Sequence, residues 1–299
     1  MIYTVTFNPA IDYVVAINKI EAGCVNRLSS EQIYFGGKGI NISLVLKELG
    51  ITSKALGFVA GFTGEAIENG LKEAGIITDF VHLEKGNSRI NVKIRSDAET
   101  ELNAAGPEIS EKALSELFRK LNILENGDTI VLAGSVPKSL PEDVYEQILR
   151  QLSDRDIRTV VDASKELLIN SLKYKPFLIK PNLQELGEIF GKTPVSEDEI
   201  TAYAEKLRQM GAQNVLVSMA GDGAILLDSE NNIHKSGVCS GIVRNSVGAG
   251  DSMIAGFLAG ISDGDFSYAL KLGTAAGGAT AFSDGLAVRE DIFTLLEQL

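Results

Sequence analysis

The sequence of 299 residues contains no tryptophan and only two histidines and two cysteines. A zinc site of the usual kind needs three or four converging histidine, cysteine or carboxylate ligands, so His82 and His234 alone argue against one. Cys24 and Cys239 form neither a C-x-x-C pair nor the dense pattern of a disulfide-rich protein. This scarcity of cysteine favours a reducing compartment, and we expect a cytoplasmic location.

Long apolar runs and an excess of positive charge are also missing. No run approaches the roughly 18 consecutive apolar residues of a membrane helix, and the first residues lack the basic and apolar regions of a signal peptide. The formal net charge of −12 argues against nucleic acids and membranes as partners, because both are bound by concentrated positive charge. With 44% apolar residues and no evident linker, we expect one globular domain over residues 1–299.

Short apolar runs alternate with segments of helical periodicity along most of the chain. A helix is predicted over residues 39–49, where four apolar residues recur at helical spacing and Gly50 provides a C-terminal stop. The strands that we expect lie at residues 3–7, 129–133, 159–161, 177–179 and 215–217. Strands that alternate with helices indicate an α/β fold with a mostly parallel central sheet flanked by helices.

Residues 28–35 and 89–95 differ from these buried strands. In residues 89–95 polar side chains alternate with Ile90, Val92 and Ile94, so one face of the strand is polar and the other apolar. We interpret this segment as an antiparallel strand of a small separate sheet, with strands within about 12–36 and 87–105. Such a sheet can serve as a lid or as a dimer surface.

Near the C-terminus, in the motif VGAGDS (247–252), two glycines precede the carboxylate of Asp251 and an apolar helical pattern follows. Backbone N–H groups at such a helix start can bind an anion, and the helix dipole adds positive potential there. Asp251 beside them is placed to act as general base for a hydroxyl that attacks a phosphoryl group. A plain helix start with an N-terminal aspartate explains the same residues, and the local pattern leaves both interpretations open.

A second glycine motif, GGKGIN (36–41), opens the helix predicted at 39–49. It lacks the spacing of a Walker loop, which argues against a P-loop NTPase, although a simple turn before a helix remains an alternative to a ligand site. The first strand is followed by NPAID (8–12). No G-x-G-x-x-G stands there, which argues against a Rossmann dehydrogenase.

Together the two glycine motifs resemble the two signatures of the ribokinase/PfkB carbohydrate kinase family, and the similarity extends over nearly the whole chain. Residues 8–12, 89–93, 106–110 and 245–253 look most like the fructose-1-phosphate kinase branch. The resemblance implies a Rossmann-like ribokinase fold with a small β-sheet lid, through which two chains often form a homodimer. It also implies transfer of the ATP γ-phosphoryl group, with Mg²⁺, to the 6-hydroxyl of D-fructose 1-phosphate.

Three alternatives to that substrate and role stay open. Tagatose 6-phosphate and fructose 6-phosphate are substrates of related kinases. A non-catalytic sugar-phosphate sensor on the same scaffold would be expected to lose its base, whereas Asp251 is present. Many members of the family carry Asp-Thr before the second glycine motif, whereas this chain has Arg-Asn-Ser at 244–246. We therefore assign no monovalent-cation site.

The resemblance also implies roles for individual residues. Asp251 is the expected base, with Gly248, Ala249 and Gly250 as its anion hole. The sugar site is expected at Asp12, Gly37, Lys38 and Asn41, and the substrate phosphate at Arg89, Arg27 and Ser135. Nucleotide contacts are expected at Lys180, Asn182, Glu185, Ser218, Gly221 and Gly223, with Mg²⁺ held mainly by the ATP phosphates and reached by Glu185 through water.

Three groups of these residues have a simpler interpretation. Asn182 and Glu185 have the spacing of a helix capping box. Arg89 fits a solvated strand face equally well. Residues 218–223 are typical of a tight Asp-Gly turn between two strands.

Overall fold

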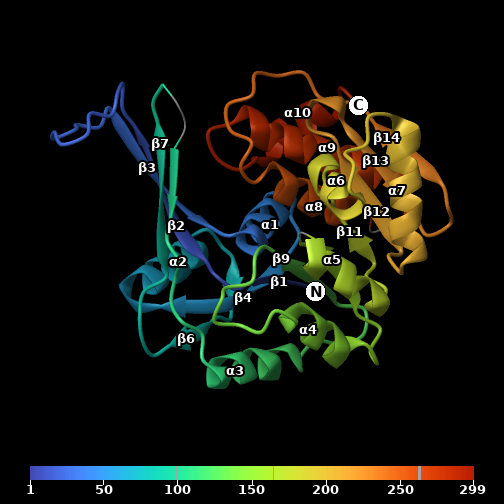
Figure 1. Ribbon diagram of the computed structural model, residues 1–299, viewed down its shortest axis with the longest axis horizontal. Helices are drawn as coiled ribbons and strands as arrows, with labels where there is room; N and C mark the ends of the chain where they lie inside the picture. The colour runs from blue at the N-terminus through green and yellow to red at the C-terminus, as the bar shows by residue number, and fades with distance from the viewer. Residues whose placement is uncertain (98–99, 164, 262–263) are drawn as a thin grey trace.

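The computed structural model describes residues 1–97, 100–163, 165–261 and 264–299. In the described part of the chain the main sheet has the strand order β14-β13-β12-β11-β10-β9-β1-β4-β5, with β6 beside β4 (Figure 1). Its strands are β1 (Ile2–Thr6), β4 (Ser53–Ala60), β5 (Ile77–Thr78), β6 (Val81–Leu83), β9 (Thr129–Ala133), β10 (Arg158–Asp162), β11 (Leu178–Ile179), β12 (Asn214–Ser218), β13 (Ala224–Leu227) and β14 (Ile233–Ser236). Only the pairs that involve β13 are antiparallel among these strand pairs. The expected α/β fold with a mostly parallel sheet is confirmed.

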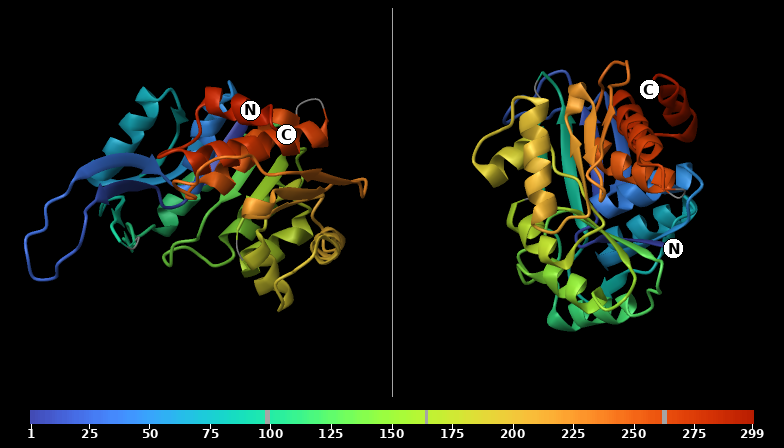
Figure 2. Two further views of the ribbon diagram at one scale, coloured as in Figure 1. Left: turned by 90° about the horizontal axis from the view of Figure 1, so that it is seen from above. Right: turned by 90° about the vertical axis from the view of Figure 1, so that its right-hand side faces the viewer.

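Helices cover both faces of this sheet (Figure 2). One layer holds α3 (Glu111–Leu121), α4 (Val144–Leu152), α5 (Lys165–Ser171), α6 (Leu183–Phe190) and α7 (Glu197–Gln209). The other holds α1 (Lys38–Glu48), α8 (Ala249–Gly260), α9 (Phe266–Phe282) and α10 (Arg289–Leu296), while α2 (Gly61–Glu73) packs on β4. Within β9, Ile130 and Leu132 meet the first layer and Val131 the second. Because both faces are covered, such strands are apolar without alternation.

A small four-stranded sheet stands away from the main body (Figures 1 and 2). Its order is β3-β2-β7-β8, with β2 at Ala10–Ala16, β3 at Ser30–Gly36, β7 at Arg89–Arg95 and β8 at Thr100–Asn103. The expectation that residues 89–95 form an antiparallel strand was wrong in one respect. β7 is antiparallel to β8 but runs parallel to β2. Between β3 and β7 the chain passes through the main sheet. This long crossover allows β7 to run in the same direction as β2.

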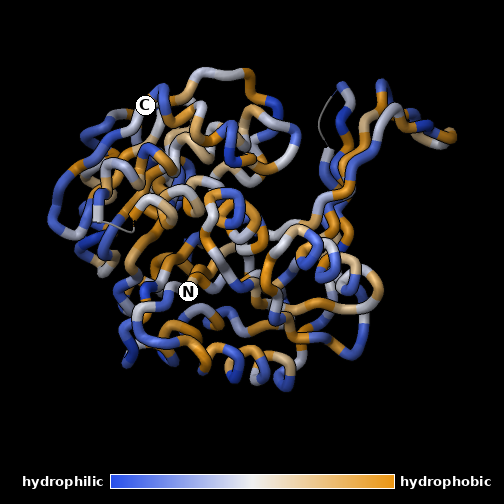
Figure 3. The backbone as a smooth tube through the Cα atoms, turned by 180° about the vertical axis from the view of Figure 1, so that it is seen from behind, coloured by the Kyte–Doolittle hydropathy of each residue, from blue (hydrophilic) through white to orange (hydrophobic). Residues whose placement is uncertain are grey.

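The two faces of the small sheet differ in character. Asp12 of β2 is paired with Asn91 of β7 and Tyr34 of β3, while the next residue, Tyr13, is paired with Val92 and Ile33. Paired residues share a face and successive residues alternate. One face is therefore polar and the other apolar, which accounts for the alternating colours along these strands in Figure 3.

The connection between β12 and β13 is longer than the sequence suggested. These strands form the expected antiparallel hairpin, with Ser218 opposite Ala224. The chain turns over residues 219–223 through a short 3₁₀ turn at Ala220–Asp222, not through a two-residue Asp-Gly turn. The strand pairing ends at Ser218 and Ala224, which leaves a loop longer than a two-residue turn. Within this loop Ala220 has a left-handed backbone with φ 50°.

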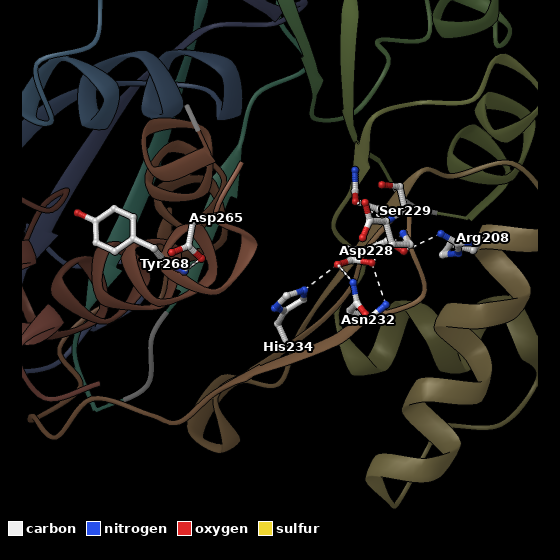
Figure 4. A network of polar contacts seen from close by, with 9 residues as sticks. Arg208, Asp228, Ser229, Asn232, His234, Asp265 and Tyr268 are labelled. Carbon is white, nitrogen blue, oxygen red and sulfur yellow. Dashed lines mark hydrogen bonds and ion pairs between the residues drawn. The ribbon is translucent and has the colours of Figure 1, made fainter. Parts of the chain in front are cut away.

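A polar network closes the next hairpin, between β13 and β14 (Figure 4). The buried carboxylate of Asp228 accepts hydrogen bonds from the backbone and side chain of Asn232 and contacts the His234 ring at 2.8 Å. Burial alone would raise the pKa of Asp228, but these hydrogen bonds hold it below its ordinary value. The network accounts for the shape of the hairpin.

No described helix combines the length and apolar character needed to cross a membrane.

Candidate active site

The two glycine motifs meet although they are 210 residues apart in sequence. The side-chain amide of Asn41, on α1, donates a 2.8 Å hydrogen bond to Asp251 Oδ2, on α8. The two helices pack against each other near the centre of Figure 1. The contact occupies one carboxylate oxygen of Asp251 and leaves the other for a different partner.

The start of α1 depends on a glycine that passes close to β1. Gly37 has φ 128°, and a Cβ at this position would lie 2.5 Å from Thr6 Cγ2. The Thr6 hydroxyl in turn accepts a 3.1 Å hydrogen bond from the Ile40 N–H group, which satisfies one of the free donors of the first turn. Lys38 and Asn41 are therefore held at the carboxyl end of β1.

The start of α8 is equally constrained. Gly248 precedes the helix with φ 84°, and a Cβ here would lie 2.7 Å from Leu286 Cδ2. A Cβ on Gly250 would lie 3.0 Å from the Lys180 ammonium. The first-turn N–H groups of α8 and this ammonium thus lie at one place, where an anionic phosphoryl group can be bound.

Asp251 is buried, with 5% of its surface exposed. Burial and the nearby charge of Asp162 raise its pKa to about 6, although Lys38, Asn41 and Lys180 act in the opposite direction. A carboxylate with such a pKa is ionised at neutral pH but accepts a proton more readily than an ordinary aspartate. This is the property that a general base requires.

Asp162 is a second buried carboxylate, which the sequence analysis missed. It ends β10 and lies 2.7 Å from the Lys38 ammonium and 3.3 Å from the Lys180 ammonium. Burial alone would raise its pKa, but the charges of Lys180 and Lys38 outweigh burial and lower it. Its position at the carboxyl end of a parallel strand, where ligand sites of α/β proteins lie, was the signal available in the sequence.

Asp12 is oriented by another residue that was missed, Asn91. The Asn91 amide donates a 2.8 Å hydrogen bond to Asp12 Oδ1. Because a carboxylate can only accept, this contact fixes which end of the amide is the nitrogen. The Asn91 carbonyl oxygen is buried and has no hydrogen-bond partner among the described residues.

Arg89 is half-buried where the small sheet joins the body. Its Nε atom donates a 3.0 Å hydrogen bond to the backbone oxygen of Asn8, and the rest of its guanidinium carries further donors. Arg89 and Ser135 line a cavity of about 310 Å³ together with Lys38 and Asp162. Arg89 is therefore not an ordinary solvated strand residue, and with Lys38 and Ser135 it offers this cavity donors suited to a phosphate group.

The capping box predicted at Asn182 is present. The Asn182 side chain accepts from the Glu185 N–H group and the Glu185 carboxylate accepts from the Asn182 N–H group, both at 2.8 Å. This cap stabilises the start of α6 by about 1 kcal/mol. Both residues also line the main cavity, so the structural role and a ligand role can coexist.

The main cavity has a volume of about 770 Å³ and adjoins the smaller one, with which it shares Gly37, Lys38, Arg89, Asp162 and Glu185. It brings together Asp12, Gly37, Lys38, Asn41, Arg89, Lys180, Asn182, Glu185, Ser218, Gly221, Gly223, Gly248, Ala249, Gly250 and Asp251. Ser135 lies in the smaller cavity. Arg27 is exposed in the segment between β2 and β3 and lines neither of the two, so its phosphate contact stays a prediction.

Apolar side chains also line the main cavity, which the sequence analysis did not anticipate. Val238, Val243 and Phe282 are among them, and residues of the loop at 218–223 line the same cavity. These residues lie in a loop and at the end of α9, where no periodic pattern marks a binding site. A planar, partly apolar ring fits such a surface.

Comparison with known proteins agrees with this arrangement. A family model for pfkB family carbohydrate kinases matches residues 5–291. The 1-phosphofructokinase of Bacillus subtilis is 47% identical over 300 residues, which cover 100% of this chain and 98% of that protein. The D-tagatose-1-phosphate kinase of Bacillus licheniformis is 41% identical and covers 96% of this chain, over 94% of its own length.

Solved structures lead to the same group. Phosphofructokinase-2 from Escherichia coli, in complex with substrates and products, superposes with a TM-score of 0.92 at 25% identity. The match covers 100% of this chain and 99% of that one. The chain therefore belongs to the PfkB family of carbohydrate kinases.

Proposed function

We propose that this kinase transfers the γ-phosphoryl group of ATP to the 6-hydroxyl of D-fructose 1-phosphate, giving fructose 1,6-bisphosphate and ADP. The observation that carries the proposal is the buried Asp251, with a raised pKa, beside the first-turn N–H groups of α8. A second cavity, lined by Lys38, Arg89 and Ser135 as well as by two carboxylates, adjoins it. The relatives at 47% and 41% identity, both named as kinases of ketose 1-phosphates, support the same reaction.

Asp251 acts as the general base in this reaction. Its free carboxylate oxygen accepts the proton of the sugar 6-hydroxyl while that oxygen forms a bond to the γ-phosphorus and the bond to the ADP oxygen breaks. The N–H groups at the start of α8 and the Lys180 ammonium stabilise the negative charge on the group in transfer. These donors are in place before substrate binds, so little reorganisation is needed.

The sugar lies between Asp251 and the small sheet. Asp12, held by Asn91, offers a carboxylate oxygen to the secondary hydroxyls, and Arg89 and Ser135 bind the 1-phosphate in the smaller cavity. The small sheet acts as a lid that excludes water, because an open site would hydrolyse ATP without a sugar. We assign the adenine ring to the apolar side chains of the main cavity, Val238, Val243 and Phe282.

Mg²⁺ is the expected cofactor beside ATP, and the residues present fit it. The carboxylates of Asp162 and Glu185 line both cavities, and Mg²⁺ prefers such oxygen ligands while it keeps several waters. Glu185 would contact the ion through water and Asp162 would face it, while the ATP phosphates supply most of the ligands. When bound, the ion neutralises phosphate charge.

D-Tagatose 1-phosphate is the second candidate substrate, because a kinase of this sugar phosphate is 41% identical to the chain. Tagatose and fructose differ only in the configuration at C4, so the grip of Asp12 on the secondary hydroxyls decides between them. Tagatose 6-phosphate and fructose 6-phosphate place the phosphate at the other end of the sugar. Either 6-phosphate would therefore have to bind in the reverse orientation between Asp251 and Arg89.

The test is ADP release from ATP, measured side by side with fructose 1-phosphate, tagatose 1-phosphate, fructose 6-phosphate and tagatose 6-phosphate. We expect the highest kcat/KM with fructose 1-phosphate and between about 5-fold and 150-fold less with its C4 epimer, because a mispaired buried polar group costs about 1–3 kcal/mol. Without sugar, ADP release should be far slower. If none of the four sugars is phosphorylated, the proposed function is wrong.

We also propose that two chains form a homodimer through the apolar face of the small sheet, in the reducing cytoplasm that the scarcity of cysteine favours. Ile33, Ile90 and Leu102 on that face are 59%, 41% and 57% exposed. Ile33, Tyr13, Val92 and Leu102 form one row across all four strands. A continuous apolar surface of this kind is typical of a protein interface.

The dimer can be tested by light scattering after gel filtration. We expect twice the chain mass of 32.0 kDa for the wild type and a monomer for the double variant Ile33→Asp/Leu102→Asp, because buried unpaired carboxylates would oppose association. Val195→Asp, at an exposed apolar residue outside the small sheet, is the matched control and should remain dimeric. A wild type that stays at the chain mass at high micromolar concentration would exclude this interface.

A further inference from the structure

A chain of buried hydroxyl groups lies behind the start of α8. The Ala287 N–H group donates to Thr280 Oγ1 at 2.9 Å, the hydroxyls of Thr280 and Ser252 are 2.7 Å apart, and Ser252 Oγ donates to the Gly248 carbonyl oxygen at 2.9 Å. Thr280 and Ser252 are both fully buried. Neither residue was assigned a role by the sequence motifs or by the reaction proposed above.

The direction of each hydrogen bond in this chain follows from its chemistry. A carbonyl oxygen only accepts, so the single proton of Ser252 goes to Gly248. Ser252 must then accept from Thr280, whose own oxygen accepts from the Ala287 N–H group. Each proton therefore has one position, and all three bonds run from residue 287 to Gly248.

The series of hydrogen bonds ends at the Gly248–Ala249 peptide, which begins the anion-binding turn. The Gly248 carbonyl oxygen accepts from the Ser252 hydroxyl and also from the Ser252 N–H group at 2.8 Å. In a trans peptide the carbonyl and the following N–H point in opposite directions. Holding the Gly248 oxygen therefore fixes the plane of the Gly248–Ala249 peptide and the direction of its N–H group, that of Ala249, which begins α8 and lies 3.3 Å from the Ser246 carbonyl oxygen.

The series of hydrogen bonds starts at Ala287, in a segment, residues 284–287, that also contacts the small sheet. The Asp284 carboxylate lies 3.5 Å from Arg95 of β7, and Gly285 packs against the ring of Tyr34 of β3. Leu286 contacts Gly248 directly. One short segment thus contacts both the lid strands and the glycine turn that faces the phosphoryl group.

We propose that Thr280 is a positioning residue for phosphoryl transfer: through Ser252 it sets the plane of the Gly248–Ala249 peptide, and through Ala287 it ties that peptide to the segment that the lid strands contact. This rests on the proposed function in one respect, phosphoryl transfer at Asp251, and not on which sugar is the acceptor. Thr280 contacts neither substrate. Its effect is on the geometry of the donors that stabilise the group in transfer.

The test compares Thr280→Val, which keeps the shape but removes the hydroxyl, with Thr280→Ser, which keeps the hydroxyl. We expect Thr280→Val to lower kcat between about 10-fold and 100-fold, with the KM values for both substrates changed by less than about threefold, because misplaced donors weaken transition-state binding. Thr280→Ser should retain most of the turnover. Each variant is assayed with the best acceptor of the wild type, so an inactive wild type would refute the proposed function and not this role.

A binding measurement separates positioning from loss of stability. ADP with aluminium fluoride mimics the phosphoryl group in transfer, and transition-state mimics bind through the donors that act in catalysis. Thr280→Val should bind ADP alone as the wild type does, but should lose at least about tenfold in affinity for ADP with aluminium fluoride. Ser252→Ala, which removes the donor to Gly248, should show the same loss and replaces Thr280→Val if that variant does not fold.

Thr4→Val is the matched control. Thr4 and Ser43 form a buried hydroxyl pair at 2.8 Å, outside both cavities. We expect this variant to lose thermal stability but to keep the wild-type kcat and the wild-type affinity for the mimic. The positioning role is refuted if Thr280→Val behaves like Thr4→Val, or if Thr280→Ser is as impaired as Thr280→Val.

Discussion

Replacing Asp251 with asparagine is expected to lower kcat by on the order of 10² or more, because an amide cannot accept the proton of the attacking hydroxyl. The substitution preserves the shape of the side chain, and its oxygen can still accept the hydrogen bond from Asn41. ADP binding should therefore change little. Steady-state turnover and calorimetric titration with ADP measure the two expectations separately.

The same variant should be more stable than the wild type at alkaline pH. Because the pKa of Asp251 is raised from 3.8 to about 6, ionisation of this carboxylate opposes folding increasingly between these two pH values and to its full extent above about 6. A change in pKa from 3.8 to about 6 corresponds to roughly 3 kcal/mol. Asp251→Asn removes this cost, so the free energy of unfolding at pH 8 should rise by up to about 3 kcal/mol.

The control for this prediction is Asp265→Asn. Asp265 caps the start of α9, where asparagine caps equally well, and it lies outside both cavities. Turnover and stability of this variant should match the wild type. An Asp251→Asn variant with wild-type turnover would show that another group accepts the proton, and the assignment of the base would be wrong.

Replacing Asp162 with asparagine is expected to affect both stability and the pH dependence of the reaction. The substitution leaves Lys180, 6% exposed, without its carboxylate partner and weakens the anchor of Lys38. Breaking a buried ion pair in this way costs about 3–5 kcal/mol. Denaturant unfolding at pH 7.5 should show this loss, and kcat should fall at least about tenfold because Lys180, which we propose stabilises the group in transfer, loses its partner.

The pH dependence has a definite sign. The base must be ionised, so kcat/KM of the wild type should rise with pH and level off above about 6, the pKa of Asp251. The charge of Asp162 contributes to that raised pKa. In Asp162→Asn this charge is absent and the lysine charges are uncompensated, so both effects lower the pKa of Asp251 and the profile should level off at lower pH.

Asp79→Asn provides the comparison for Asp162→Asn. Asp79 forms an ion pair with Lys120 outside both cavities. Its loss should change stability by no more than about 1 kcal/mol, since both side chains are partly exposed, and should leave the pH profile in place. If the profile of Asp162→Asn coincides with that of the wild type, then Asp162 does not raise the pKa of Asp251.

Features that depend on neighbours in the sequence were predictable. The helix expected at 39–49 is α1 at Lys38–Glu48, and the strand expected at 129–133 is β9. The helix start at Asp251 followed from two glycines before an apolar periodic segment, and α8 begins at Ala249. In each case the pattern lies within one element, where side-chain period and backbone conformation are locally coupled.

Features that depend on contacts between distant elements were not. Three contacts join residues 79 or more positions apart: the parallel pairing of β7 with β2, the hydrogen bond from Asn91 to Asp12, and the ion pair of Lys38 with Asp162. The ion pair of Lys180 with Asp162 joins residues 18 positions apart that lie in different elements. Asparagine and aspartate at these positions look like ordinary strand residues in the sequence. Only the packing of strands and helices reveals which of them are buried and paired.

For the site as a whole, local patterns together with the family resemblance were sufficient to identify the motifs, the phosphoryl-transfer chemistry and many of the residues that line the main cavity. Whether Asp251 was a base or a plain helix start could not be settled there, since both have the same local sequence. In the folded chain, burial and the charge of Asp162 together raise the pKa of Asp251, which favours the base that we propose. Both effects depend on the distance through space between groups that the sequence places far apart.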